Sequence, residues 1–193
     1  HISNWNVSKV TNMTNLFKNK LFNEDISNWN TSKVTNMAYM FSFATSFDQS
    51  LNSWNVSNVT NMASIFSTAE SFNQPLDNWN VENVTNISSM FYNTTSFNQP
   101  LNDWNVGNVT NMSYMFYNAA AFNQPIGSWD TSNVTNMRSM FEYSSIFNQN
   151  IRVWSTINVA DFTNMFDGAT AMYASYDGTT GYGDTPTQEF FNQ

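Results

Sequence analysis

The residues that could carry out catalysis are few and widely spaced. His1 is the sole histidine of the 193-residue chain, and there is no cysteine. A serine or cysteine nucleophile therefore lacks its histidine base, and thiolate zinc sites are excluded. General acid–base catalysis needs paired carboxyl groups. The acidic residues of the repeated region occur singly, as at Asp77, Glu82, Asp103, Asp130 and Glu142. With no phosphate-binding glycine loop either, the sequence predicts a protein that is not an enzyme and has no cofactor.

The tail holds the one candidate for a metal site. Asp177 and Asp184 flank the glycine-rich segment DGTTGYGD, and their oxygens could bind Ca²⁺. The spacing is not that of an EF-hand loop, and Asp-Gly is typical of a plain turn. We therefore predict no bound metal and favour the turn.

Two sets of side chains are candidates for binding a ligand. The first is a polar column beside the tryptophans, predicted to face outward, and the second is a group of tyrosines. Tyrosine is favoured at binding surfaces because it offers a large contact area at low entropic cost. The alternatives are solubility for the polar column and packing between repeats for the tyrosines. The predicted ligand-contacting residues are Asn55, Asn80, Asn105, Asp130, Asn78, Asp103, Tyr92, Tyr114 and Tyr117.

A repeat positions these side chains. Seven tryptophans recur 24 residues apart once and 25 residues apart thereafter, at Trp5, Trp29, Trp54, Trp79, Trp104, Trp129 and Trp154. A fixed period of this size is typical of a solenoid, in which each unit buries its apolar face against its neighbours. The units begin near residues 2, 26, 51, 76, 101, 126 and 151.

Each unit combines two apolar patterns. Around Trp104 the apolar residues are two apart, which is typical of a short, half-buried strand. Met112, Met115, Phe116 and Ala119 then follow the i, i+3, i+4, i+7 spacing of a helix face. We therefore expect an α/β solenoid over residues 1–166, with about seven 25-residue coils that each contain a short parallel β-strand and a short helix. Residues 167–193 are expected to form a C-terminal cap.

The repeat WNVSNVTNM-x-x-MF-x-x-A-x-x-FNQPL resembles the BspA-like leucine-rich-repeat surface proteins, in a branch formerly described as a Mycoplasma protein family of unknown function. The resemblance extends over roughly residues 2–172. It implies a leucine-rich-repeat-like solenoid on a cell or virion surface, without catalytic residues. The implied role is adhesion or recognition of a protein or glycan ligand.

Charge and composition narrow the partners further. A net charge of −8 argues against binding to nucleic acid or to an anionic membrane. No apolar run approaches the length of a transmembrane helix, so we expect no membrane insertion. The first residues already lie inside a repeat, which suggests a fragment of a longer extracellular or surface-exposed array. A structural spacer and, less strongly, an ice-binding array remain as alternative functions, and the oligomeric state is left open.

Overall fold

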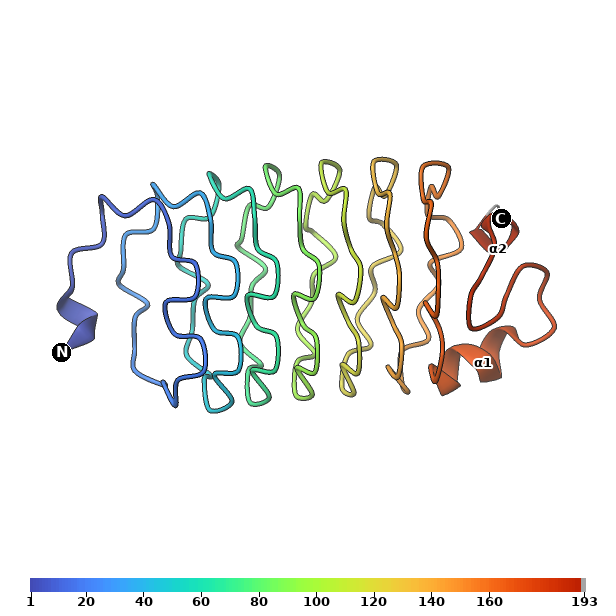
Figure 1. Ribbon diagram of the computed structural model, residues 1–193, viewed down its shortest axis with the longest axis horizontal. Helices are drawn as coiled ribbons and strands as arrows, with labels where there is room; N and C mark the ends of the chain where they lie inside the picture. The colour runs from blue at the N-terminus through green and yellow to red at the C-terminus, as the bar shows by residue number, and fades with distance from the viewer. Residues whose placement is uncertain (192–193) are drawn as a thin grey trace.

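The computed structural model describes residues 1–191, and its most regular contact is a parallel backbone bridge between successive repeats. We call each repeat a coil. The bridges join, in order, Asn12, Asn36, Asn61, Asn86, Asn111, Asn136 and Asp161, one from each of the seven coils. The coils stack along one axis into an elongated body with the two termini at opposite ends (Figure 1).

Helices are found only at the two ends of this stack. They are the 3-10 helix η1 (Ile2–Asn4) and the α-helices α1 (Thr170–Tyr176) and α2 (Gln188–Phe191). Between residues 5 and 169 the chain forms turns and isolated bridges, with no helix and no strand. The predicted α/β solenoid, with a strand and a helix in each leucine-rich-repeat-like coil, is therefore wrong.

Tight turns replace the expected strand. The N–H of Trp104 donates to the carbonyl of Leu101 at 3.2 Å, and the N–H of Val109 donates to the carbonyl of Val106 at 2.9 Å. Bonds between residues three apart close β-turns, whereas a strand has no bonds within itself. Leu101, Trp104 and Val106 are buried, as the pattern predicted, but the turns rather than an extended backbone direct them inward.

The expected helix is also absent, although its apolar residues are buried. Met112, Met115, Phe116 and Ala119 are all fully enclosed. Tyr114 and the residue four positions later, Asn118, have φ values of 57° and 48°, in the left-handed region that a right-handed helix excludes. Amide groups alternate between two partners as a result. The N–H of Phe116 donates to Met140 in the next coil, whereas the N–H of Met115 donates to Met112 within its own coil.

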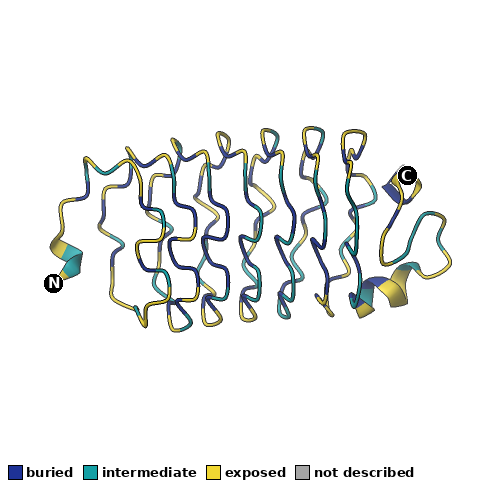
Figure 2. Cartoon of the chain, in the orientation of Figure 1, coloured by how far each residue is buried: buried dark blue, intermediate teal, exposed yellow. Residues whose placement is uncertain are grey.

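The core consists of aromatic columns that run the length of the stack (Figure 2). Phe116 stacks on Phe122 of its own coil at 4.0 Å and on Phe141 of the next coil at 5.6 Å. Equivalent phenylalanine pairs recur in the other coils. Each such pair adds about 0.5–1.5 kcal/mol beyond the burial of its area. Aromatic stacking between coils therefore accounts for much of what strands and helices provide in other folds.

The tail covers the last coil. Phe190 and Phe191 of α2 are buried, and the N–H of Phe166 donates to the carbonyl of Asp184 at 2.9 Å. The side chain of Arg152 donates to the carbonyl of Phe190 at 3.3 Å. The segment that we expected to act as a cap thus packs on the final coil, with its last two residues, 192 and 193, lying outside the described residues.

Candidate functional site

The structure brings the three predicted tyrosines together. The rings of Tyr92 and Tyr117, from neighbouring coils, stack at 4.5 Å with an interplanar angle of 8°. Tyr114 lies 6.2 Å from Tyr117, and Tyr143 meets Tyr117 edge-on at 5.5 Å. We call Tyr92, Tyr114, Tyr117 and Tyr143 the tyrosine cluster. It spans three consecutive coils.

The left-handed turns position this cluster. Tyr114 and Tyr143 themselves have positive φ values of 57° and 59°, and Tyr92 and Tyr117 each precede a left-handed asparagine. A left-handed residue reverses the local course of the chain, so side chains at and beside it point away from the core. Tyr143 is 46% exposed, and the other three are half-buried against one another. Stacking of the coils then brings these positions into one band.

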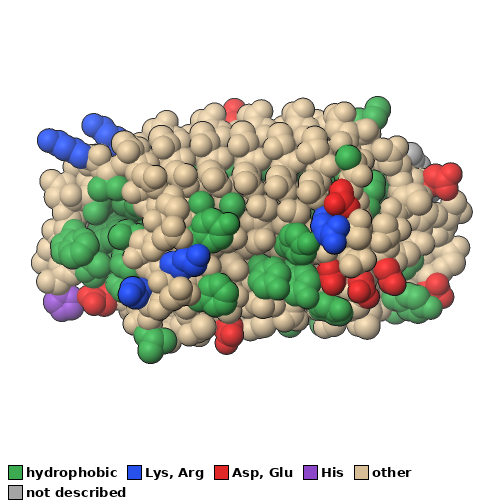
Figure 3. Space-filling model, viewed as in Figure 1, with side chains coloured by type: hydrophobic (Ala, Val, Ile, Leu, Met, Phe, Trp, Pro, Cys, Tyr) green, Lys and Arg blue, Asp and Glu red, His purple; other side chains and the backbone are tan. Residues whose placement is uncertain are grey.

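Charged side chains border the cluster. The guanidinium Nε of Arg138 donates to the hydroxyl of Tyr114 at 2.8 Å, and its Nη1 lies 3.8 Å from a carboxylate oxygen of Asp161. The hydrogen bond with Tyr114 raises the pKa of Arg138 above its ordinary value, so the group stays charged. Glu142 is only 8% exposed and occupies the coil position of Tyr117. Hydrophobic, basic and acidic side chains gather across one face of the molecule (Figure 3).

Burial also affects the phenol at the centre of the cluster. Loss of hydration is the main cause that raises the pKa of Tyr117, with the neighbouring Tyr92 and Glu142 acting in the same direction. Tyr117 therefore remains neutral and can donate a hydrogen bond throughout the physiological pH range. The cluster thus combines neutral phenols with a fixed positive charge and a carboxylate.

A second aromatic pair lies nearer the N-terminus on the same coil positions. Tyr39 and Phe43 are both left-handed and exposed, and the ammonium of Lys18 lies 4.8 Å from the Tyr39 ring centroid. In the coil that follows, the same two positions hold Ser64 and Thr68. The exposed aromatic surface is therefore divided into two groups.

The predicted polar column is exposed, and its oxygen atoms stabilise turns. In the side chain of Asn55, Oδ1 accepts hydrogen bonds from the N–H and the hydroxyl of Ser57, at 3.0 and 2.7 Å. Asn80, Asn105 and Asp130 accept from the N–H two residues later in the same way. These are Asx turns, a common structural role for Asn and Asp. Hydrogen bonds from Ser132 accordingly lower the pKa of Asp130.

The two remaining polar residues also have local partners. The N–H of Asn78 donates to Oδ1 of Asn52 at 3.0 Å, and Oδ1 of Asp103 accepts from Nδ2 of Asn102 at 2.7 Å. Within residues 1–191 no hydrogen bond links the polar column to the tyrosine cluster. The predicted residues therefore divide into two separate groups, of which only the tyrosines form a compact one.

Three members of this region were not among the predicted site residues: Tyr143, Arg138 and Glu142. A usable signal was present, because Tyr143 stands 14 residues after its tryptophan, as Phe43 does. Arg138 and Glu142 carry no such signal. Their proximity to the tyrosines follows from the pairing of neighbouring coils, which periodicity alone does not reveal.

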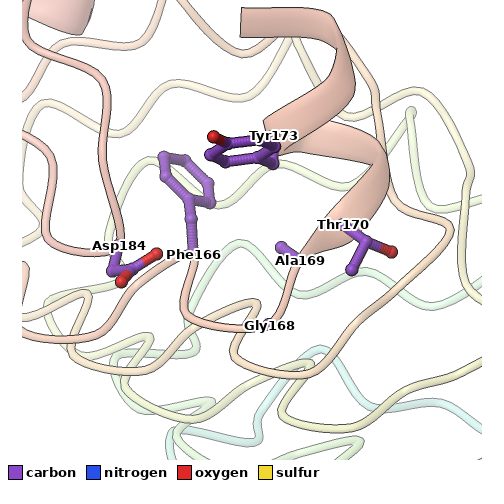
Figure 4. Close-up of a pocket in the computed structure, with 6 residues that line it drawn as sticks. All are labelled: Phe166, Gly168, Ala169, Thr170, Tyr173 and Asp184. Carbon is purple, nitrogen blue, oxygen red and sulfur yellow. The ribbon is translucent and has the colours of Figure 1, made fainter. Parts of the chain in front are cut away.

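One small pocket of about 140 Å³ lies where the last coil meets the tail (Figure 4). Its wall includes the rings of Phe166 and Tyr173 and the carboxylate of Asp184. Asp177, the other residue of the calcium alternative, does not line it. Within residues 1–191 there is no cluster of three His, Asp or Glu side chains suited to a metal ion. The calcium alternative thus gains no support.

Comparison with known proteins relates the chain to one family. A family model described as "Mycoplasma protein of unknown function" matches residues 1–101 and again residues 75–178. The double match agrees with a repeated unit. A search of curated proteins finds no match to the chain. Among the described residues, no helix has the length and apolar character needed to cross a membrane.

Proposed function

We propose, from the premise that this chain belongs to the family described as "Mycoplasma protein of unknown function", that it is a non-enzymatic recognition module. It would act at a cell or virion surface, where the tyrosine cluster binds a protein ligand in an adhesive contact. The resemblance of the repeat to BspA-like surface proteins supports both the location and the role.

The observation that carries this proposal is the difference between the cluster and the columns that hold the stack together. Core tryptophans and phenylalanines recur in every coil, yet the position of Tyr117 is held by Ser42 and Ser67 in earlier coils. Those coils form the same parallel bridges. Since stacking succeeds with serine there, it does not require tyrosine. A half-exposed aromatic group that stacking does not need is typical of a binding surface.

Ring orientation favours a protein ligand over a glycan. A sugar usually lies flat on an exposed aromatic face. The faces of Tyr92 and Tyr117 are turned toward each other at 4.5 Å, and Tyr143 lies edge-on to Tyr117. The cluster therefore offers ring edges, phenol hydroxyls and the charge of Arg138, a combination enriched in protein interfaces.

The proposal can be tested with the intact chain on an array of immobilised glycans and extracellular-matrix proteins. We expect capture of at least one protein. A variant with Tyr92→Ser, Tyr117→Ser and Tyr143→Asn should lose that capture. Each replacement is found at the same position of another coil, so the fold should persist.

The matched control removes exposed apolar groups elsewhere. Val153→Ser and Ile157→Ser also introduce residues that other coils carry at these positions, and both side chains are exposed. Capture should survive these changes. Capture by the triple variant would exclude the cluster as the site, and capture of glycans alone would exclude a protein ligand.

A structural spacer is the second candidate, supported by the unbroken series of bridges from Asn12 to Asp161. Such a series gives a stiff rod. It predicts no capture by the unmodified chain on the array. Ice binding is weaker, because the exposed threonine row is single and the Thr60 hydroxyl already donates to Thr35. Absence of thermal hysteresis would exclude it.

A further inference from the structure

The hydrogen bonds between coils all have the same direction along one side of the stack. In coil 2 the N–H groups of residues 37, 39, 41 and 43 donate to the next coil, over 2.8–3.0 Å. The carbonyl groups of residues 36, 38, 40 and 42 accept from the preceding coil. Four peptide groups per coil therefore point their N–H toward the C-terminus of the stack. A bond from Thr35 to Thr11 runs the other way.

This polarity makes the two ends of the stack chemically different. At the N-terminal end, the equivalent carbonyls belong to Asn12, Thr14, Leu16 and Lys18, and within residues 1–191 they accept no hydrogen bond. At the C-terminal end the tail takes two of the equivalent donors: the N–H groups of Asn164 and Phe166 bind Thr185 and Asp184. One end is thus covered, and the other presents a row of acceptors.

The apolar part of the same end is open as well. Trp5 is 58% exposed, whereas each of the other six tryptophans is at most 4% exposed. The indole N–H of Trp29 donates to the carbonyl of Ile2 at 3.1 Å, and that of Trp5 has no acceptor within residues 1–191. Leu21 is 88% exposed. We call Trp5, Asn12, Thr14, Leu16 and Leu21 the N-terminal face.

Side-chain charge follows the direction of the peptide dipoles. All four lysines lie in the first two coils, beside three acids, whereas residues 151–193 hold five acids and Arg152 (Figure 3). Aligned peptide groups place partial negative charge at the end where their carbonyls emerge, and cations are stabilised there. A partner for the N-terminal face must therefore offer N–H donors and favour a basic rim.

A second copy of the same face does not meet this requirement. Two N-terminal faces related by a twofold axis would set carbonyls against carbonyls and lysines against lysines. The N–H edge of another molecule's last coil is already covered by its tail. A coil of the same repeat does meet it, because its N–H row, its tryptophan ring and its Leu or Ile carbonyl match what Trp5 and the four carbonyls lack.

We propose that the N-terminal face is a docking face for one further coil of this repeat, carried on the same polypeptide and stacked in the same direction. The six coil–coil interfaces already present show the contact that it would make. Docking would bury Trp5, give its indole N–H an acceptor, and extend the bridge series by one member.

The test adds such a coil to the full chain. A copy of residues 51–75 is joined directly to Ile2, and the control carries a scrambled extension of the same composition. We expect the amide groups of residues 11–22 to exchange hydrogen at least roughly tenfold more slowly in the first protein only. Quenching of Trp5 fluorescence by acrylamide should fall, measured by difference against Trp5→Phe versions of both proteins.

The two readouts distinguish the possible outcomes. Unchanged exchange and unchanged quenching in the extended protein would overturn the proposal. The unextended chain should sediment as a monomer at all concentrations. Concentration-dependent association with protection of Trp5 would also overturn it, because the occupant would then be a second molecule. Ligand capture by the tyrosine cluster is independent of either result.

Discussion

The indole N–H of Trp104 donates a 3.0 Å hydrogen bond to the main-chain carbonyl of Leu76 in the preceding coil. The same bond recurs at every later tryptophan and at the three before it, back to Trp29. Each tryptophan therefore fills the core of one coil and satisfies a buried carbonyl of another. The coils form no sheet, and this bond is one of the contacts that set their spacing.

Removing that N–H should destabilise the stack. For Trp104→Phe we expect the free energy of unfolding to fall by about 2 kcal/mol, because a buried carbonyl loses its partner and the core loses volume. Chemical denaturation followed by circular dichroism would measure the change. Trp5→Phe is the matched control. Its indole is exposed and bonded to no acceptor, so its effect should stay within about 0.5 kcal/mol. Equal losses in the two variants would contradict the role of the bond.

A substitution at Thr68 should stabilise the protein. Thr68 is a β-branched residue at φ 59°, and its buried hydroxyl has no hydrogen-bond partner. Asn93 and Asn118 hold the same coil position, and Nδ2 of Asn118 donates to Oδ1 of Asn93 at 3.0 Å. Asparagine tolerates a left-handed backbone and would extend that pair to a third coil. For Thr68→Asn we expect a gain of about 1 kcal/mol in the free energy of unfolding.

The comparison for Thr68 is Thr85→Asn. The hydroxyl of Thr85 already donates to the carbonyl of Thr60 at 3.2 Å, and Thr85 is not among the left-handed residues. The same chemical change there should bring no gain. Thermal melts of both variants would decide, and a loss of stability in Thr68→Asn would show that strain and the unpaired hydroxyl are not the controlling factors.

Alkaline pH should weaken the tail. Burial is the main cause that raises the pKa of Tyr182 to about 12 from its ordinary 10.0, with Asp184 and Asp177 adding to it. The folded state therefore holds the phenol proton more tightly than the unfolded state. The stability linked to this group is complete below pH 10.0 and is lost as the pH rises toward about 12. Hydrogen exchange of residues 167–191, measured across that range, should accelerate.

The control for this pH dependence is Tyr182→Phe. It keeps the ring that packs on Phe166 and Phe190 and removes the titrating group. Exchange in the tail of this variant should vary less between pH 10 and 12 than in the unmodified protein. An identical acceleration in both proteins would assign the effect to other groups.

The inward residues of a coil could be predicted from the sequence, but its backbone could not. Met112, Met115, Phe116 and Ala119 are buried, as their spacing indicated. The helix inferred from that spacing fails at Tyr114 and Asn118, because left-handed residues four apart also return side chains to one side. Spacing reports which side chains share a face, and two backbones can satisfy the same spacing.

The site shows the same division. Tyr92, Tyr114 and Tyr117 could be selected as contact residues from their type and position. Their ring-on-ring arrangement, and the addition of Arg138 and Tyr143, depend on the pairing of coils about 25 residues apart. For Asn55 and Asn105 the letters suggested a polar surface, whereas the structure shows the carbonyl oxygens of these side chains engaged in turns.

By itself the sequence determined the period, the number of coils and the identity of the core, because a repeated apolar residue has to be buried against its copies. Only the tertiary structure decided that the coils are made of turns, since the amide groups of alternate residues find their partners in neighbouring coils rather than four residues back. It also decided the direction of those bonds. That direction leaves acceptors at the N-terminal face and donors beneath the tail, a difference that no single repeat contains.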